Sequence, residues 1–119
     1  MRNMKFIVNV VLAASSIAAF GQESARTVQY HSQDIVAIRA KVKYTTLIEL
    51  PTTEKIMEAA TGDKEFWIVD VVGNFCFVHP SKQCISSNLN LITDKGNIYS
   101  FTLQDISALS TALFHRAKC

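Results

Sequence analysis

Two acidic residues near the middle of the chain, Glu54 and Glu58, have the residue type and the spacing of a catalytic carboxylate pair. On a helix, residues four apart share a face, so one carboxyl group could act as acid and the other as base. On a strand they would lie about 13 Å apart at about 3.3 Å per residue, too far for joint acid and base work. Thr53 as a cap and Gly62 as a terminator favour one or two helical turns here. Because charged residues usually face water, we interpret both carboxylates as solvent-facing and not catalytic.

Nucleophilic catalysis is not indicated elsewhere in the sequence. A nucleophile needs a base within hydrogen-bond reach and a third group that orients this base. The three histidines, His31, His79 and His115, lie in separate segments, and nothing brings any of them to a particular serine or cysteine. There is no G-x-S-x-G, no phosphate loop and no G-x-G-x-x-G. We therefore expect no enzyme, no catalytic residue and no cofactor.

Cys76, His79 and Cys84 are three zinc-type ligands within nine residues. Their spacing, C-x2-H-x4-C, matches no standard zinc site and has no fourth ligand nearby, so we expect no metal. In an oxidising compartment Cys76 and Cys84 would suit a disulfide, worth about 2 to 3 kcal/mol through closure of the loop between them. A buried Cys76 with an unpaired Cys84 is the alternative, since sequence spacing does not fix the Cα distance. Cys119, the last residue, is then the odd cysteine.

The first residues have the pattern of a secretory signal peptide. "MRNMK" is positively charged, the segment 6–20, "FIVNVVLAASSIAAF", is apolar, and Ala19-Phe20-Gly21 offers small residues two apart. We expect cleavage before Gln22 and export to the periplasm. An uncleaved anchor is the alternative, but fifteen helical residues reach only about 22 Å of the roughly 30 Å hydrocarbon layer.

The chain of 119 residues is 49% hydrophobic and 18% charged, which is typical of one globular domain. Removing residues 1–21 takes away Arg2 and Lys5, so that ten basic residues balance ten acidic ones. No basic run interleaved with aromatic residues remains, so we expect no nucleic-acid partner. No repeat or linker divides residues 22–119, which we therefore expect to form a single domain.

Alternation of apolar and polar residues predicts two hairpins. The segments 88–93 and 98–103 flank "DKGN", which has the Asp and Gly of a tight reversal. The segments 66–72 and 75–79 flank Gly73-Asn74, where positive φ at the first position would suit a type II′ turn, and Pro80 ends the second strand. Residues 34–50 are extended by composition but too long for one strand, so we expect a bend near 40–43.

The last segment, "DISALSTALFHRAK", has a helical pattern. Asp105 is an N-cap candidate, its apolar residues form one stripe, and basic residues gather at its end. We expect a short amphipathic helix from about residue 105, with a frayed tail as the alternative. The fold class predicted is all-β, a small β-sandwich of antiparallel hairpins with a short C-terminal α-helix.

Four stretches in a fixed order carry a family resemblance: "TTLIELPTTEKI", "GDKEFWIV", "NFCFVHP" and "SNLNLITDKGNIYSFTL". Together they resemble the N-terminal domain of the TrbG/CagX conjugal-transfer proteins, periplasmic parts of the type IV secretion core complex. The resemblance spans about residues 30–103. The matching features are Thr46 to Pro51, Glu54, Gly62-Asp63, Trp67, Pro80, Asn88-Leu89, Thr93-Asp94, Tyr99, Phe101 and Leu103.

This resemblance implies a β-sandwich that assembles with copies of itself, with a TonB-like scaffold protein and with a small lipoprotein, in a channel across the periplasm. Membrane association, including that with the outer membrane, would come through these partners. It also implies that residues 56–60 form a strand rather than a helix. Trp67, Tyr99 and Phe101 are the expected core anchors, and the indole N–H of Trp67 needs a partner.

Family members usually continue into a second β-domain that carries the lipoprotein contact, whereas this chain stops at Cys119. The alternative function is therefore a free-standing secreted module that binds a protein ligand through a sheet edge or its terminal helix.

Overall fold

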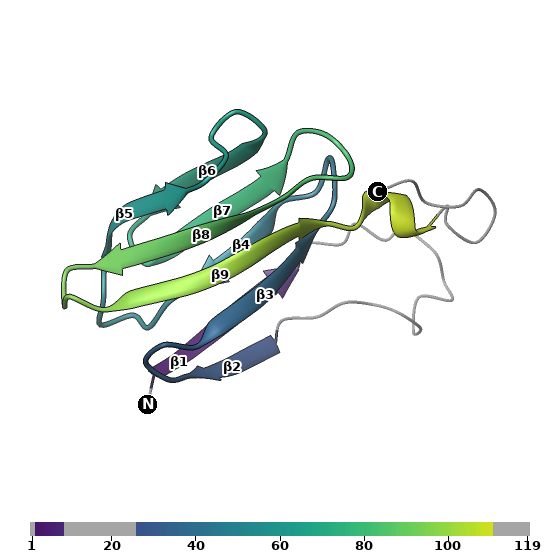
Figure 1. The fold of residues 1–119 in the computed structure, drawn as a ribbon. Helices are drawn as coiled ribbons and strands as arrows, with labels where there is room; N and C mark the ends of the chain where they lie inside the picture. Colours follow the sequence, from purple (N-terminus) through teal and green to yellow (C-terminus); the bar gives the residue numbers. More distant parts are fainter. Residues whose placement is uncertain (1, 9–25, 111–119) are drawn as a thin grey trace.

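The computed structural model describes residues 2–8 and 26–110 (Figure 1). In this part of the chain nine strands and one short 3₁₀ helix follow one another. They are β1 (Arg2–Val8), β2 (Arg26–Tyr30), β3 (Ile35–Ala40), β4 (Thr46–Glu49), β5 (Ile56–Thr61), β6 (Trp67–Val72), β7 (Phe75–Pro80), β8 (Ser86–Thr93), β9 (Ile98–Asp105) and η1 (Ser107–Ser110).

The strands form two sheets that enclose one core. Sheet A has the order β2-β1-β4-β7-β6, and sheet B has the order β3-β9-β8-β5. Buried residues from the inner faces of both sheets belong to a single hydrophobic cluster, so the sheets are the two layers around this core (Figure 1). The expected core anchors, Trp67, Tyr99 and Phe101, are among the largest fully buried side chains. Trp67 Nε1 has no hydrogen-bond acceptor among the described residues.

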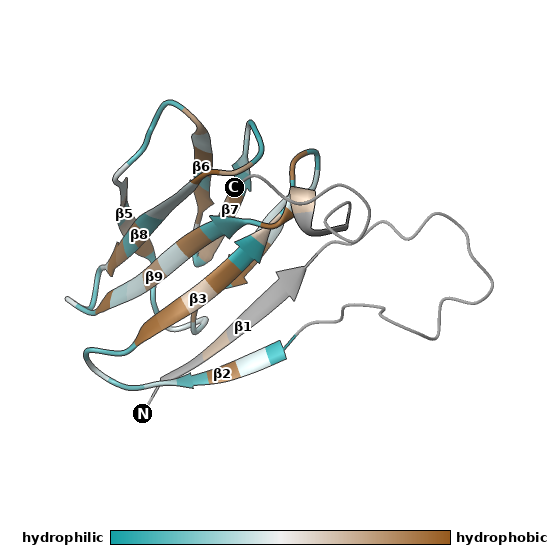
Figure 2. Ribbon diagram, turned by 45° about the vertical axis from the view of Figure 1, so that its right-hand side comes forward, coloured by the Kyte–Doolittle hydropathy of each residue, from teal (hydrophilic) through white to brown (hydrophobic). Residues whose placement is uncertain are grey.

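Both predicted hairpins are confirmed. β8 and β9 flank residues 94–97, where Thr93 N–H donates to Asn97 O over 2.9 Å and Gly96 has a φ of 79°. β6 and β7 flank Gly73-Asn74, and within this turn only Gly73, with a φ of 60°, is in the positive region. The alternation behind these predictions can be followed as changing hydropathy along β8 and β9 in Figure 2.

The bend expected near residues 40–43 is confirmed, because β3 ends at Ala40 and β4 begins at Thr46, with Lys43 at a φ of 73°. β3 and β4 lie in different sheets, however, so this segment carries the chain from one layer to the other. β3 then pairs in parallel with β9. The expectation of antiparallel hairpins alone is therefore wrong at this edge of sheet B.

The strand that the resemblance implied at 56–60 is confirmed, and the helix favoured by local propensity is wrong. β5 (Ile56–Thr61) pairs antiparallel with β8, with a bulge between Ile56 and Glu58. This pairing satisfies the backbone and buries Ile56, gains that outweigh a weak helical preference.

The prediction of a C-terminal α-helix is wrong for the residues that the structure describes. β9 continues to Asp105, which pairs with Ala40 of β3, and only one 3₁₀ turn follows at Ser107–Ser110. The Asp105 carboxylate still caps this turn, since it accepts hydrogen bonds from the backbone and hydroxyl of Ser107. Residues 111–118, the rest of the expected helix, lie outside the described residues.

Residues 2–8, which belong to the expected signal peptide, form β1 in sheet A. β1 lies between β2 and β4, and its Met4 side chain is 0% exposed. Residues 9–25, which include the expected cleavage position, lie outside the description. Among the residues described, no helix has the length and apolar character needed to span a membrane.

We predict that Gly73→Val lowers the free energy of unfolding by about 1 to 2 kcal/mol, because a β-branched residue is strained at positive φ. Urea unfolding followed by tryptophan fluorescence measures the loss. Lys95→Ala, at an exposed position of the other hairpin turn, is the matched control and is expected to change stability by less than about 0.5 kcal/mol. Equal effects of the two substitutions would contradict the assigned turn.

Candidate functional site

The residue types that could do chemistry do not converge in the described part of the chain. Cys76 and His79 lie on opposite faces of β7, with Cys76 in the core and His79 half-buried on the outer face. Cys84 lies in the exposed loop before β8, at a φ of 63°. No group of three or more His, Cys, Asp or Glu side chains within the described ranges could hold a metal ion.

The structure corrects the expected Cys76–Cys84 bridge. Cys76 is a free thiol inside the core, and Cys84 is disulfide-bonded but not to Cys76. The physical reason is direction: Cys76 points between the two sheets, where an exposed loop cannot reach it. Burial, together with the negative charge of Asp70, raises the pKa of the Cys76 thiol from 9.0 to about 12.

Glu54 is buried, which corrects the interpretation of this carboxylate as solvent-facing. It is 7% exposed and accepts hydrogen bonds from Thr93 Oγ1 at 2.7 Å, Asn97 Nδ2 at 2.8 Å and Tyr99 OH at 2.6 Å. Glu58, the other carboxylate, is exposed on β5 as expected. The two carboxylates therefore occupy opposite environments, and the pair does not exist as an acid and base site.

The hydrogen bonds of Glu54 fix the loop before β5 to the β8–β9 turn. Lys55 and Asp94 strengthen this attachment, since Lys55 N–H donates to Asp94 Oδ1 over 3.0 Å and Asp94 N–H donates to Lys55 O over 2.9 Å. We name Glu54 and its three donors, Thr93, Asn97 and Tyr99, the Glu54 cluster. It positions one end of sheet B.

A second tyrosine holds β2 to the same end of sheet B. The Tyr30 hydroxyl donates to Asp34 O over 2.6 Å and accepts from Ser100 N–H over 2.9 Å. Its ring lies 4.9 Å from the ring of Tyr99, tilted by 53°. Tyr30 and the Glu54 cluster thus meet at Tyr99, in the core beneath this end of the sheet.

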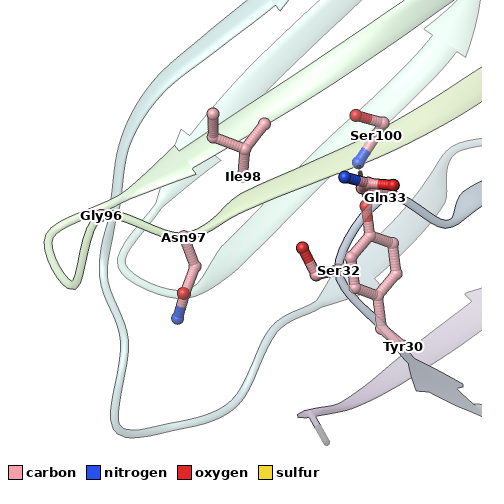
Figure 3. A pocket seen from close by; sticks show the side chains of 7 residues that line it. All are labelled: Tyr30, Ser32, Gln33, Gly96, Asn97, Ile98 and Ser100. Carbon is pink, nitrogen blue, oxygen red and sulfur yellow. Dashed lines mark hydrogen bonds between the residues drawn. The ribbon is translucent and has the colours of Figure 1, made fainter.

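A hollow of about 340 Å³ opens beside Tyr30 (Figure 3). Most of its lining is polar but uncharged, and no nucleophile with a neighbouring base lies in it. A hollow with this lining is better suited to binding a side chain or a loop of a partner than to catalysing a reaction. The lining residues are Tyr30, Ser32, Gln33, Gly96, Asn97, Ile98 and Ser100.

Next to this hollow, exposed apolar residues cross the outer face of sheet B. We name them the apolar stripe: Ile35 (67% exposed), Ile98 (54%), Ile92 (37%) and Met57 (65%). Ile92 and Ile98 are paired across β8 and β9, Ile35 begins β3 beside β9, and Met57 lies in the β5 bulge next to the partner of Ile92. Elsewhere this face carries mostly polar and small side chains, for example Asn90 and Thr102. The apolar stripe is therefore confined to one end of the sheet.

The outer face of sheet A also carries several apolar side chains. Ile68 and Val72 of β6 are exposed, and Leu47 of β4 is half-buried on the same face. Phe75 and Phe77 of β7 stand between them in the register. Exposed apolar side chains that gather in this way commonly mark protein-protein contacts.

Comparison with known proteins shows the family of this chain. The family model described as CagX, conjugal transfer protein, matches residues 23–116. The chain belongs to the CagX family. The resemblance noted in the sequence is thereby confirmed, and the CagX match includes the Glu54 cluster and the apolar stripe.

Relatives of this CagX-family chain include the type IV secretion system protein PtlF of Bordetella pertussis. It is 29% identical over 119 residues, an alignment that covers 82% of this chain and 43% of the relative. The PtlF homologue of Bordetella parapertussis matches with the same identity and coverage. The chain thus spans less than half the length of these curated relatives.

We predict that Glu54→Ala lowers the free energy of unfolding by about 3 kcal/mol, because it removes the acceptor shared by the buried hydroxyls of Thr93 and Tyr99 and by the half-buried amide of Asn97. Glu58→Ala, an exposed carboxylate four residues away, is the control, with an expected change below about 0.5 kcal/mol. Chemical unfolding measures both. A Glu54→Ala protein as stable as the Glu58→Ala protein would show that the cluster stabilises nothing.

We predict that the buried thiol of Cys76 makes the stability of the fold depend on pH. Its folded pKa is raised above the unfolded value of 9.0, so the unfolded chain ionises first. The stability that comes from a neutral buried thiol is complete below pH 9 and is lost as the pH rises from 9 towards 12. The difference in unfolding free energy between wild type and Cys76→Ala should therefore shrink over this range, and a constant difference would contradict the assignment.

Proposed function

We propose that this chain is a structural, non-enzymatic subunit of a type IV secretion or conjugation apparatus in the cell envelope. Membership of the CagX family over residues 23–116 is the observation that carries the proposal. The PtlF relatives, which are type IV secretion system proteins, support it. In this role the domain binds other proteins and does no chemistry of its own.

Its place is the periplasm, reached through residues 1–21 as a removable signal peptide. The charged start, the apolar segment and the small residues before Gln22 support this step. Its partners are copies of itself, a TonB-like scaffold protein and a small lipoprotein, and the last two connect it to the membranes. The family resemblance supports these partners.

The apolar stripe and the hollow beside it supply the surface for assembly. Ile35 and Ile98 are each more than half exposed, which leaves apolar area in water that a partner would bury. Because the Glu54 cluster fixes the β8–β9 turn, Ile98 beside this turn is held in place before binding. A preformed surface loses little conformational entropy on association.

Extraction of the cell envelope with mild detergent, followed by size separation and native mass measurement, tests the function. The chain is expected in a large complex together with the scaffold protein. A strictly monomeric periplasmic protein without any co-purifying scaffold would overturn the proposal.

We predict that Ile98→Asp lowers the fraction of the chain in this complex about ten-fold or more, equivalent to about 1.4 kcal/mol, because the partner would then bury a charge. Thr102→Asp, on the same outer face of β9 but outside the apolar stripe, is the matched control and should assemble normally. Urea unfolding verifies that both variants remain folded. Equal assembly of the two variants would exclude the apolar stripe as the contact.

A further inference from the structure

β1 occupies an unusual position for a segment that is expected to be removed. It lies between β2 and β4 and runs antiparallel to both. β2 is joined to sheet A only through β1, since the sheet order is β2-β1-β4. Met4 of β1 is completely buried. This strand therefore completes both the sheet and part of the core.

Removal of residues 1–21, which is part of the proposed function, would open a gap in sheet A. β4 would lose the strand that pairs with Thr46–Glu49, and β2 would lose its strand partner in the sheet. β2 would still be held near its position, because the Tyr30 hydroxyl is hydrogen-bonded to the backbone of Asp34 and Ser100. We name the space between β2 and β4 the strand-acceptor gap. Unpaired backbone groups on both of its sides make it a template for an added strand.

The sequence of β2 has the same pattern as the strand that fills the gap. β1 reads Arg2-x-Met4-x-Phe6 and β2 reads Arg26-x-Val28-x-Tyr30, so both have a basic, an apolar and an aromatic residue at alternate positions. In the observed antiparallel register Arg2 is opposite Tyr30, Met4 is opposite Val28 and Phe6 is opposite Arg26. Suppose that β2 of a second copy replaced β1 in this register. Arg26 of each copy would then lie opposite Tyr30 of the other, and the two Val28 residues would lie opposite each other.

We propose that, in the chain without residues 1–21, the strand-acceptor gap is filled by β2 of a second copy, which gives a two-fold symmetric dimer. A register centred on Val28 is self-complementary, as an isologous interface requires. Each β2 then pairs with the other β2 and with β4 of the other copy. The two A sheets become one continuous sheet across the symmetry axis.

A second copy suits the strand-acceptor gap better than an unrelated strand, because both β4 and β2 have lost a pairing strand. Any extended peptide could satisfy the backbone of β4, but the exchange of β2 also satisfies β2 itself, whose strand partner was removed. Val28 of the second copy takes the backbone position of Met4 and so offers an apolar side chain where one is fully buried. The exchange thus pairs the open edges of β2 and β4 and fills the place of Met4 in each copy.

The test uses the full chain, expressed in a Gram-negative host and purified from the periplasm, with Val28→Cys or Arg26→Cys introduced. Intact mass first reports whether residues 1–21 are present. Mild oxidation is then expected to join Val28→Cys chains as dimers, because residues directly opposite each other in antiparallel strands have Cβ atoms about 5 Å apart. Arg26→Cys chains should remain at the wild-type level, since their cysteines would lie about 13 Å apart along the strands.

A synthetic peptide of residues 2–8, "RNMKFIV", provides a second measurement on the unmodified protein. It should occupy the strand-acceptor gap and halve the mass seen by light scattering, while a scrambled peptide should not. A processed protein that is monomeric and gives no Val28→Cys dimer overturns the proposal, as does cross-linking of Val28→Cys to a different protein. A chain that keeps residues 1–21 also overturns it, because β1 then stays in place, but leaves the role in secretion intact.

Discussion

The buried carboxylate of Glu54 is the interaction on which the rest of the domain depends. A buried carboxyl group is costly unless hydrogen-bond donors replace its water, and here Thr93, Asn97 and Tyr99 do so. These donors come from the end of β8, the turn and the start of β9, 39 to 45 residues away in sequence. The cluster therefore joins the loop before β5 to the β8–β9 hairpin and fixes the end of sheet B.

The location of this cluster explains why a small domain has an ordered apolar surface. The inner side of the hairpin holds Tyr99 against Glu54 and Tyr30, and its outer side presents Ile92 and Ile98. Since both sides belong to the same strands, stabilising the inner side also fixes Ile92 and Ile98 of the apolar stripe. Sheet A adds a second apolar outer face, and the proposed exchange of β2 would add a contact at its edge. These features suit a subunit that is built to contact other proteins.

The sequence predicts the hairpins and the strand bend because their causes are local. Gly73 and the "DKGN" turn lie between alternating segments, so neighbouring residues determine the pairing. The burial of Glu54 could not be predicted, because its donors follow it by about forty residues and charged residues near a turn usually face water. The parallel β3–β9 pair and the continuation of β9 to Asp105 also depend on distant partners. The local signals for the apolar stripe were Ile92 and Ile98, each an apolar residue on the otherwise polar face of its strand.

The central claim is that this end of sheet B becomes an interface within an envelope complex. Hydrogen-deuterium exchange, compared between the free chain and the chain in the purified complex, tests it most directly. We expect slower exchange in the complex at the start of β3, in the bulge of β5 and in the β8–β9 turn, with little change at the other end of sheet B. Unchanged exchange at these segments, with protection elsewhere, would contradict it.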